Sequence, residues 1–95
     1  MVIRAIGVAW YRAEDYQRIR DISDDEMVPT FKEFEAKMAI RLPQFQAPGV
    51  ILEKVIIEPD ELLAFAGEHH GGKIDTQVRS EFAARRVAEK YGTDH

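Results

Sequence analysis

The fold of this chain is decided by its first apolar stretch, Val2-Ile3-Arg4-Ala5-Ile6-Gly7-Val8-Ala9-Trp10-Tyr11. A short run rich in Val, Ile and aromatic residues predicts a buried strand, here over about 2–11. The next residues are Arg12-Ala13-Glu14-Asp15-Tyr16. Acidic side chains suit the partial positive charge at the start of a helix. We therefore expect the strand to turn directly into a helix over about 13–22.

The two faces of this first strand differ in bulk. The odd positions are mostly small, as at Ala5, Gly7 and Ala9, whereas the even positions are mostly large and include Trp10. Alternate side chains of a strand point to opposite faces. One face should therefore let another backbone approach closely, and Trp10 should belong to the core on the other. Arg4 is expected to extend into solvent at the strand start, with a buried anion ligand as the alternative.

The second helix has a clear start signal. Thr30 and Glu33 match a capping box, in which the hydroxyl and the carboxylate satisfy free backbone N–H groups at the helix N-terminus. Apolar residues then recur every three or four positions. Pro43 interrupts this pattern, because proline has no backbone N–H and clashes with the preceding turn, so the helix should kink or end near Leu42.

The second half of the chain repeats the order of strand, helix and helix. A strand is expected over about 50–58, and Pro59 suits the first position of the helix that follows. This helix should stop at Gly71-Gly72. A last helix should begin near Asp75 or Thr76 and run to about Tyr91-Gly92.

The sequence thus predicts a single small α/β (α+β) domain over residues 1–95 with the order β-α-α-β-α-α. The segments 1–48 and 49–91 form a β-α-α pseudo-repeat, and the strands could pair parallel or antiparallel. An isolated pair of strands is marginal in water, so these two strands need helices over one face and further strands beside them. We therefore expect a homodimer in which a second copy extends the sheet and covers an exposed edge.

Composition restricts the functions that the chain can carry. The net charge is −4, with seven Lys or Arg and eight acids in residues 1–48 and six and nine in residues 49–95. This balance argues against binding to nucleic acid. The chain has no Cys, so disulfides and thiol chemistry are excluded. No apolar run approaches about 20 residues and no signal peptide is recognisable, so we expect a cytoplasmic protein without a membrane partner.

The corner after the first strand is the candidate ligand site. Ligands of α/β proteins often bind where strands end and helices begin. This corner carries one guanidinium group, two carboxylates and two phenols. They belong to Tyr11, Arg12, Glu14, Asp15 and Tyr16. The alternative is that they only cap the helix and form a surface ion pair. The corner Glu58-Pro59-Asp60-Glu61 would join the site only if the strands are parallel.

Two clusters could suggest a metal, and neither fits one. The acidic loop lacks the glycine and the closing glutamate of an EF-hand, and we interpret it as solvated; its acids are Asp21, Asp24, Asp25 and Glu26. His69-His70 are adjacent, whereas a helix presents two histidines to one metal at a spacing of four. We therefore expect no metal and no cofactor.

The last helix carries cations on one side, at Arg79, Arg86 and Lys90. They could contact phosphate, but Glu81 and Glu89 dilute the charge, so we interpret this side as a solvated helix face. The chain contains no phosphate-binding glycine loop and no serine nucleophile motif. Nothing in the sequence points to catalysis.

Several runs resemble a group of small uncharacterised bacterial proteins of about 95–110 residues. The resemblance covers most of the chain and is carried by Tyr11-Arg12-Ala13-Glu14-Asp15-Tyr16, Thr30-Phe31-Lys32-Glu33-Phe34, Ile57-Glu58-Pro59-Asp60-Glu61 and Arg79-Ser80-Glu81-Phe82-Ala83. The chain departs from that group at Phe65-Ala66, where Trp or Cys is more common, and at Pro43. The resemblance implies a bacterial source and the same order of elements, but no activity.

The sequence leaves two classes of function. The first is a non-enzymatic protein-interaction or regulatory module that acts as a homodimer. The alternative is a small-molecule-binding protein or minor enzyme, in which Arg12 would hold a carboxylate or phosphate and a neighbouring carboxylate would act as base.

Overall fold

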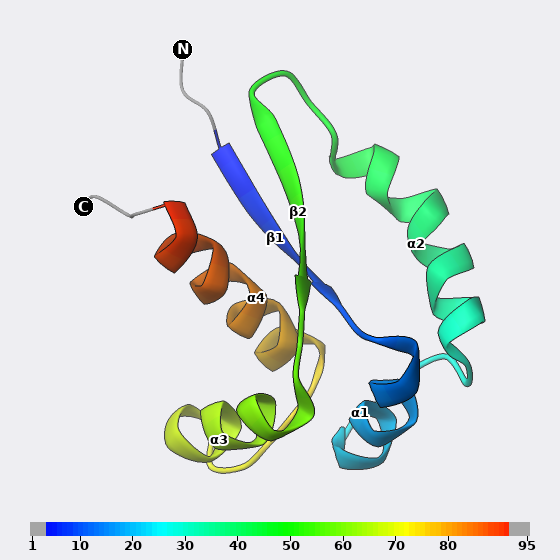
Figure 1. The fold of residues 1–95 in the computed structure, drawn as a ribbon, viewed down its shortest axis with the longest axis vertical. Helices are drawn as coiled ribbons and strands as arrows, with labels where there is room; N and C mark the ends of the chain where they lie inside the picture. Colours follow the sequence, from blue (N-terminus) through cyan, green and yellow to red (C-terminus); the bar gives the residue numbers. More distant parts are fainter. Residues whose placement is uncertain (1–3, 92–95) are drawn as a thin grey trace.

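The computed structural model describes residues 4–91, which form one two-stranded sheet and four α-helices (Figure 1). In chain order the elements are β1 (Arg4–Trp10), a 3-10 turn (Ala13–Asp15), α1 (Tyr16–Ile22), α2 (Phe31–Phe45), β2 (Val50–Ile56), α3 (Pro59–His69) and α4 (Thr76–Tyr91). The predicted α+β fold and its order β-α-α-β-α-α are confirmed. The predicted start of the first strand at Val2 and Ile3 and the predicted helix end at Gly92 lie outside the described residues.

The two strands are parallel, with Arg4 opposite Val50 and Trp10 opposite Ile56. An antiparallel return would need two connecting helices of similar length. Here α1 has seven residues and α2 has fifteen, so the longer helix carries the chain back to the start of the sheet. Both strand-to-helix corners consequently lie at the same end, where Arg18 of α1 forms an exposed ion pair with Asp60 of α3.

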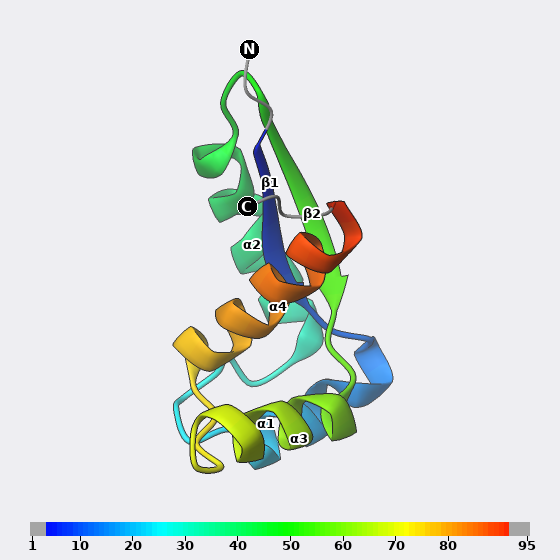
Figure 2. The same ribbon diagram turned by 90° about the vertical axis from the view of Figure 1, so that its left-hand side faces the viewer.

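Helices α4 and α2 lie on opposite sides of the sheet (Figures 1 and 2). Helix α4 packs on the face of β1 that carries the small side chains. A Cβ atom added at Gly7 would lie 2.5 Å from the carbonyl oxygen of Ala83, closer than real Cβ contacts. The prediction that this face lets another backbone approach closely is therefore confirmed.

The core lies at the end of the sheet where the helices converge. Trp10 is 9% exposed and meets Phe34 of α2 edge to face, with 4.9 Å between the ring centroids. Tyr11 packs on the same Phe34 ring at 5.0 Å. The largest fully buried side chains surround this aromatic cluster and are Ile19, Ile57, Leu62, Ile74 and Pro59. Trp10 thus belongs to the core, as predicted.

Helices α2 and α4 both begin at their predicted caps, although the capping box of α2 is only half formed, because the Glu33 carboxylate accepts from the Thr30 hydroxyl and not from a backbone N–H. Thr30 accepts a hydrogen bond from the Glu33 N–H at 3.1 Å, and Asp75 accepts one from the Val78 N–H at 2.9 Å. We expected α2 to kink or end near Leu42, and it does not end there, because the helix continues through Pro43 to Phe45. A proline in the last turn removes only one helical hydrogen bond, so it destabilises the helix less than a proline in the middle would.

The chain also leaves β2 earlier than predicted. β2 ends at Ile56, and Glu58 caps α3 by accepting a hydrogen bond from the Glu61 N–H at 3.0 Å. At the other end of α3, Gly71 and Gly72 have φ angles of 63° and 87°. Glycine adopts this left-handed region without a steric penalty, which explains why the helix stops there as predicted.

We predict that Gly7→Ala destabilises the fold by about 1–3 kcal/mol, the usual cost of overpacking a core. The new methyl group would meet the backbone of α4, which cannot rotate away as a side chain can. Gly67→Ala is the matched control, because nothing lies within 4 Å of a Cβ atom at that helical position. The free energy of unfolding of the control should rise by about 0.5–1 kcal/mol. Urea unfolding measures both changes, and equal effects would contradict the close packing.

Candidate functional site: a groove along the free edge of β1

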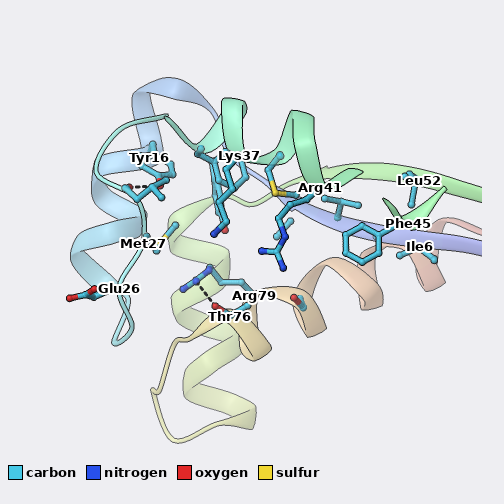
Figure 3. Close-up of a pocket in the computed structure, with 18 residues that line it drawn as sticks. Ile6, Tyr16, Glu26, Met27, Lys37, Arg41, Phe45, Leu52, Thr76 and Arg79 are labelled. Carbon is cyan, nitrogen blue, oxygen red and sulfur yellow. Dashed lines mark hydrogen bonds between the residues drawn. The ribbon is translucent and has the colours of Figure 1, made fainter. Parts of the chain in front are cut away.

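A groove of about 310 Å³ runs along β1 between α2 and the start of α4 (Figure 3). Four consecutive residues of β1, from Ile6 to Ala9, line it. Because successive side chains of a strand point to opposite faces, a surface that touches four in a row follows the strand's edge. The floor of the groove is therefore the edge of β1 that faces away from β2.

The backbone along this edge is unpaired. The Arg4 N–H donates to the Gly49 carbonyl at 2.7 Å, and the Trp10 carbonyl accepts from the Ile57 N–H at 2.9 Å. In a parallel ladder alternate residues bond to the neighbouring strand, so the even positions of β1 face β2. Ala5, Gly7 and Ala9 consequently turn their N–H and C=O groups outward. Within residues 4–91 no hydrogen bond reaches these groups.

Helix α2 forms a wall that carries positive charge. Lys37 and Arg41 are one helical turn apart, and Figure 3 shows both side chains pointing into the groove toward Arg79. Both are exposed, and neither forms an ion pair with any residue between 4 and 91. Met38 and Phe45 complete this wall with apolar surface.

Arg79 of α4 forms the opposite wall, and its charge is already neutralised. Its side chain is 6% exposed and makes two 2.8 Å hydrogen bonds to the two carboxylate oxygens of Asp25. It also donates to the hydroxyls of Ser23 and Thr76. The hydrogen bonds from Arg79 lower the pKa of Asp25 from its ordinary 3.8 to about 2. This bidentate pair fixes the loop after α1 to the start of α4.

Two interpretations from the sequence were wrong here. Arg79 does not lie on a solvated helix face, because it shares a buried stripe with Ala83 and Val87 at a spacing of four. The acidic loop is not simply solvated either. Asp25 pairs with Arg79, and Asp24 accepts a hydrogen bond from the Ile74 N–H at 2.8 Å. The spacing of Arg79, Ala83 and Val87 is a signal that the sequence already contained.

The structure separates the residues of the predicted ligand corner. Tyr11 and Tyr16 are buried and line the inner end of the groove, where the Tyr16 hydroxyl donates to the Val28 carbonyl at 2.6 Å. Arg12 and Asp15 form an ion pair at 3.2 Å outside it. The exposed Glu14 does not line the groove either.

The buried phenols are poor bases. Burial raises the pKa of Tyr11 to about 12, although the neighbouring Arg79 acts in the opposite direction. Burial raises the pKa of Tyr16 as well. Both groups therefore stay protonated at neutral pH and cannot accept a proton from a ligand, and the Tyr16 hydrogen is already donated to the Val28 carbonyl.

The sequence analysis missed Lys37 and Arg41. Both flank the apolar positions of α2, and their spacing of four places them on one side of the helix. Only the position of α2 beside β1 shows that this side faces an open strand edge.

The two histidines lie away from the groove. His70 approaches Glu81, with 3.3 Å between Nε2 and the nearest carboxylate oxygen, and His69 is exposed. Between residues 4 and 91 no group of three or more His, Cys, Asp or Glu side chains could hold a metal ion. None of the helices in this part of the chain is both long and apolar enough to cross a membrane.

No protein-family model, curated protein or solved structure matches this chain. The resemblance to small bacterial proteins therefore stays a prediction.

We predict that Asp25→Asn lowers the free energy of unfolding at pH 7 by about 3 kcal/mol, because it leaves the buried Arg79 without a counter-charge. The pKa of Asp25 is lower in the folded chain than its ordinary value. Its stabilisation is therefore complete above about pH 4 and is lost as the pH falls toward 2. Chemical unfolding across this range should show a larger loss in the natural chain than in the variant, which keeps only the contribution of other carboxylates such as Glu53. Asp21→Asn, at an exposed position, is the control and should change little.

Proposed function

We propose that this protein is a non-enzymatic protein-interaction module that works as a homodimer through the outer edge of β2. One observation carries the proposal: within residues 4–91 the sheet has only two strands, and no hydrogen bond reaches the outward backbone groups of β2 between Leu52 and Ile56. A sheet this small gains stability from further strands.

The outer edge of β2 offers both hydrogen bonds and apolar surface. By the alternation of the ladder, Leu52, Lys54 and Ile56 turn their N–H and C=O groups away from β1. Ile51 and Ile56 are 41% and 43% exposed. Figure 2 shows α2 on the β1 side of the sheet, away from this edge. Antiparallel pairing with β2 of a second copy would give a continuous four-stranded sheet.

Lysine on an edge strand commonly prevents such pairing, so the position of Lys54 matters. Its ammonium group lies over the Trp10 ring, 4.2 Å from the ring centroid. This cation–π contact draws the charge over the face of the sheet. Lys54 therefore leaves the backbone edge accessible.

The non-enzymatic part of the proposal is supported by the ionisable groups of the groove. Arg79 and Asp25 are bound to each other, and the raised pKa of Tyr11 keeps its phenol protonated. The alternative, a carboxylate- or phosphate-binding protein at the first corner, has less support. Arg12, which would hold the anion, is paired with Asp15 and lies outside the groove.

We predict that the natural chain is a dimer by light scattering and that Lys54→Pro is a monomer. The N–H of Lys54 points away from β1, so proline removes a hydrogen bond to the second copy without breaking the β1–β2 ladder. Lys54→Ala is the control: it loses the same contact with Trp10, keeps the N–H and should remain a dimer. Circular dichroism would establish that both variants are folded. A monomeric natural chain, or a Lys54→Pro dimer, would overturn the proposal.

A further inference from the structure

We infer that the groove along β1 binds an extended, acidic segment of a partner protein, which adds to the sheet as a strand beside β1. This site lies on the edge of the sheet opposite to β2. The inference therefore does not depend on the dimer proposed above.

The backbone of β1 has the pattern that strand addition requires. Ala5, Gly7 and Ala9 turn outward three N–H and three C=O groups at every second residue. In complexes formed by strand addition, such main-chain groups supply affinity, and pockets for alternate side chains supply specificity. Gly7 and the two alanines have no bulky side chains that would hinder an approaching strand.

The two walls of the groove favour a single extended chain as the ligand. Helix α2 stands on one side and the start of α4 on the other, as Figure 3 shows. A strand added to β1 would lie about 4.8 Å from it, on the side where the groove opens between the two helices. The outer edge of β2, which α2 does not flank, is the better edge for a second folded copy.

Charge indicates an acidic ligand. Lys37 and Arg41 project into the groove without acidic partners among residues 4–91, whereas the charge of Arg79 is balanced by Asp25. Glu26 also lines the groove, but Figure 3 shows its side chain pointing away from Lys37 and Arg41. The groove is therefore locally positive in a chain of net charge −4. A carboxylate on the bound strand could meet both α2 cations.

The far end of the groove is apolar. Phe45 of α2 is 51% exposed and Ile6 of β1 is 36% exposed, and Leu52 of β2 lies beside them. Solvent-exposed side chains of this size are favourable contacts for apolar residues of a partner. We therefore expect the bound segment to place an acidic residue against Lys37 and Arg41 and an apolar residue against Ile6 and Phe45.

Selection from a phage-displayed library of random seven-residue peptides, the length of β1, tests this inference. Selected peptides should combine acidic and apolar residues and lack proline at alternate positions. Their affinities for the folded chain are then measured by fluorescence polarisation. Lys37→Glu and Arg41→Glu should each weaken binding by about tenfold. Lys32→Glu is the matched control, because it makes the same charge change on α2 outside the groove and should leave the affinity unchanged.

Methylation of the backbone nitrogens of a selected peptide tests strand pairing directly. Methylation at the residues that face β1 should abolish binding, and methylation at the intervening residues should not. The inference is overturned if no peptide is enriched, if Lys37→Glu and Arg41→Glu bind normally, or if methylation has no effect. It is also overturned if inorganic phosphate or acetate displaces the peptide at concentrations matched for ionic strength, since the groove would then be a small-anion site. None of these outcomes decides the oligomeric state, which light scattering measures separately.

Discussion

The structure depends on how closely α4 can approach β1. The contact between Gly7 and the backbone of Ala83 fixes the middle of the helix against the strand. The bidentate pair of Arg79 with Asp25 fixes its first turn to the loop that leads into α2. These two contacts hold together β1, the loop after α1 and α4, which are distant from one another in the sequence. Without the small residue at position 7, the helix could not lie this close to the sheet.

The same packing makes the two edges of the sheet different. Helix α4 begins on the β1 side and ends over β2, where Lys90 and Tyr91 contact Glu53 (Figure 2). Together with α2 it converts the β1 edge into a walled groove and leaves the β2 edge open. A parallel pair of strands with unpaired backbone on both sides is a weak sheet by itself. The two edges therefore differ in accessibility, since helices flank the edge of β1 and α2 lies away from the edge of β2.

The charged side chains of this protein fall into two groups: those that pair with each other inside the fold and those that stay exposed. Arg79 and Asp25 satisfy each other and stabilise the loop, whereas Lys37 and Arg41 remain exposed beside the groove. An exposed ion pair such as Arg12 with Asp15 adds little to stability. The cations that are available to a partner are thus not those at the first strand-to-helix corner, although that corner is the more conspicuous in the sequence.

Most of the local structure could be predicted from the sequence. The small face of the first strand, the caps at Thr30 and Asp75, the proline at the start of α3 and the two glycines after it all act on neighbouring residues. A helix end near Leu42 was one of the two outcomes expected from Pro43. It was not found, because a proline near a helix end destabilises the helix little and the sequence does not show how far the last turn extends. The structure was needed to find the parallel pairing of the strands, the partner of Arg79, and the position of Lys37 and Arg41 beside an open edge. These features depend on contacts between residues that are far apart in the sequence, such as Asp25 and Arg79, which are separated by 54 positions, and no local pattern shows which residues meet.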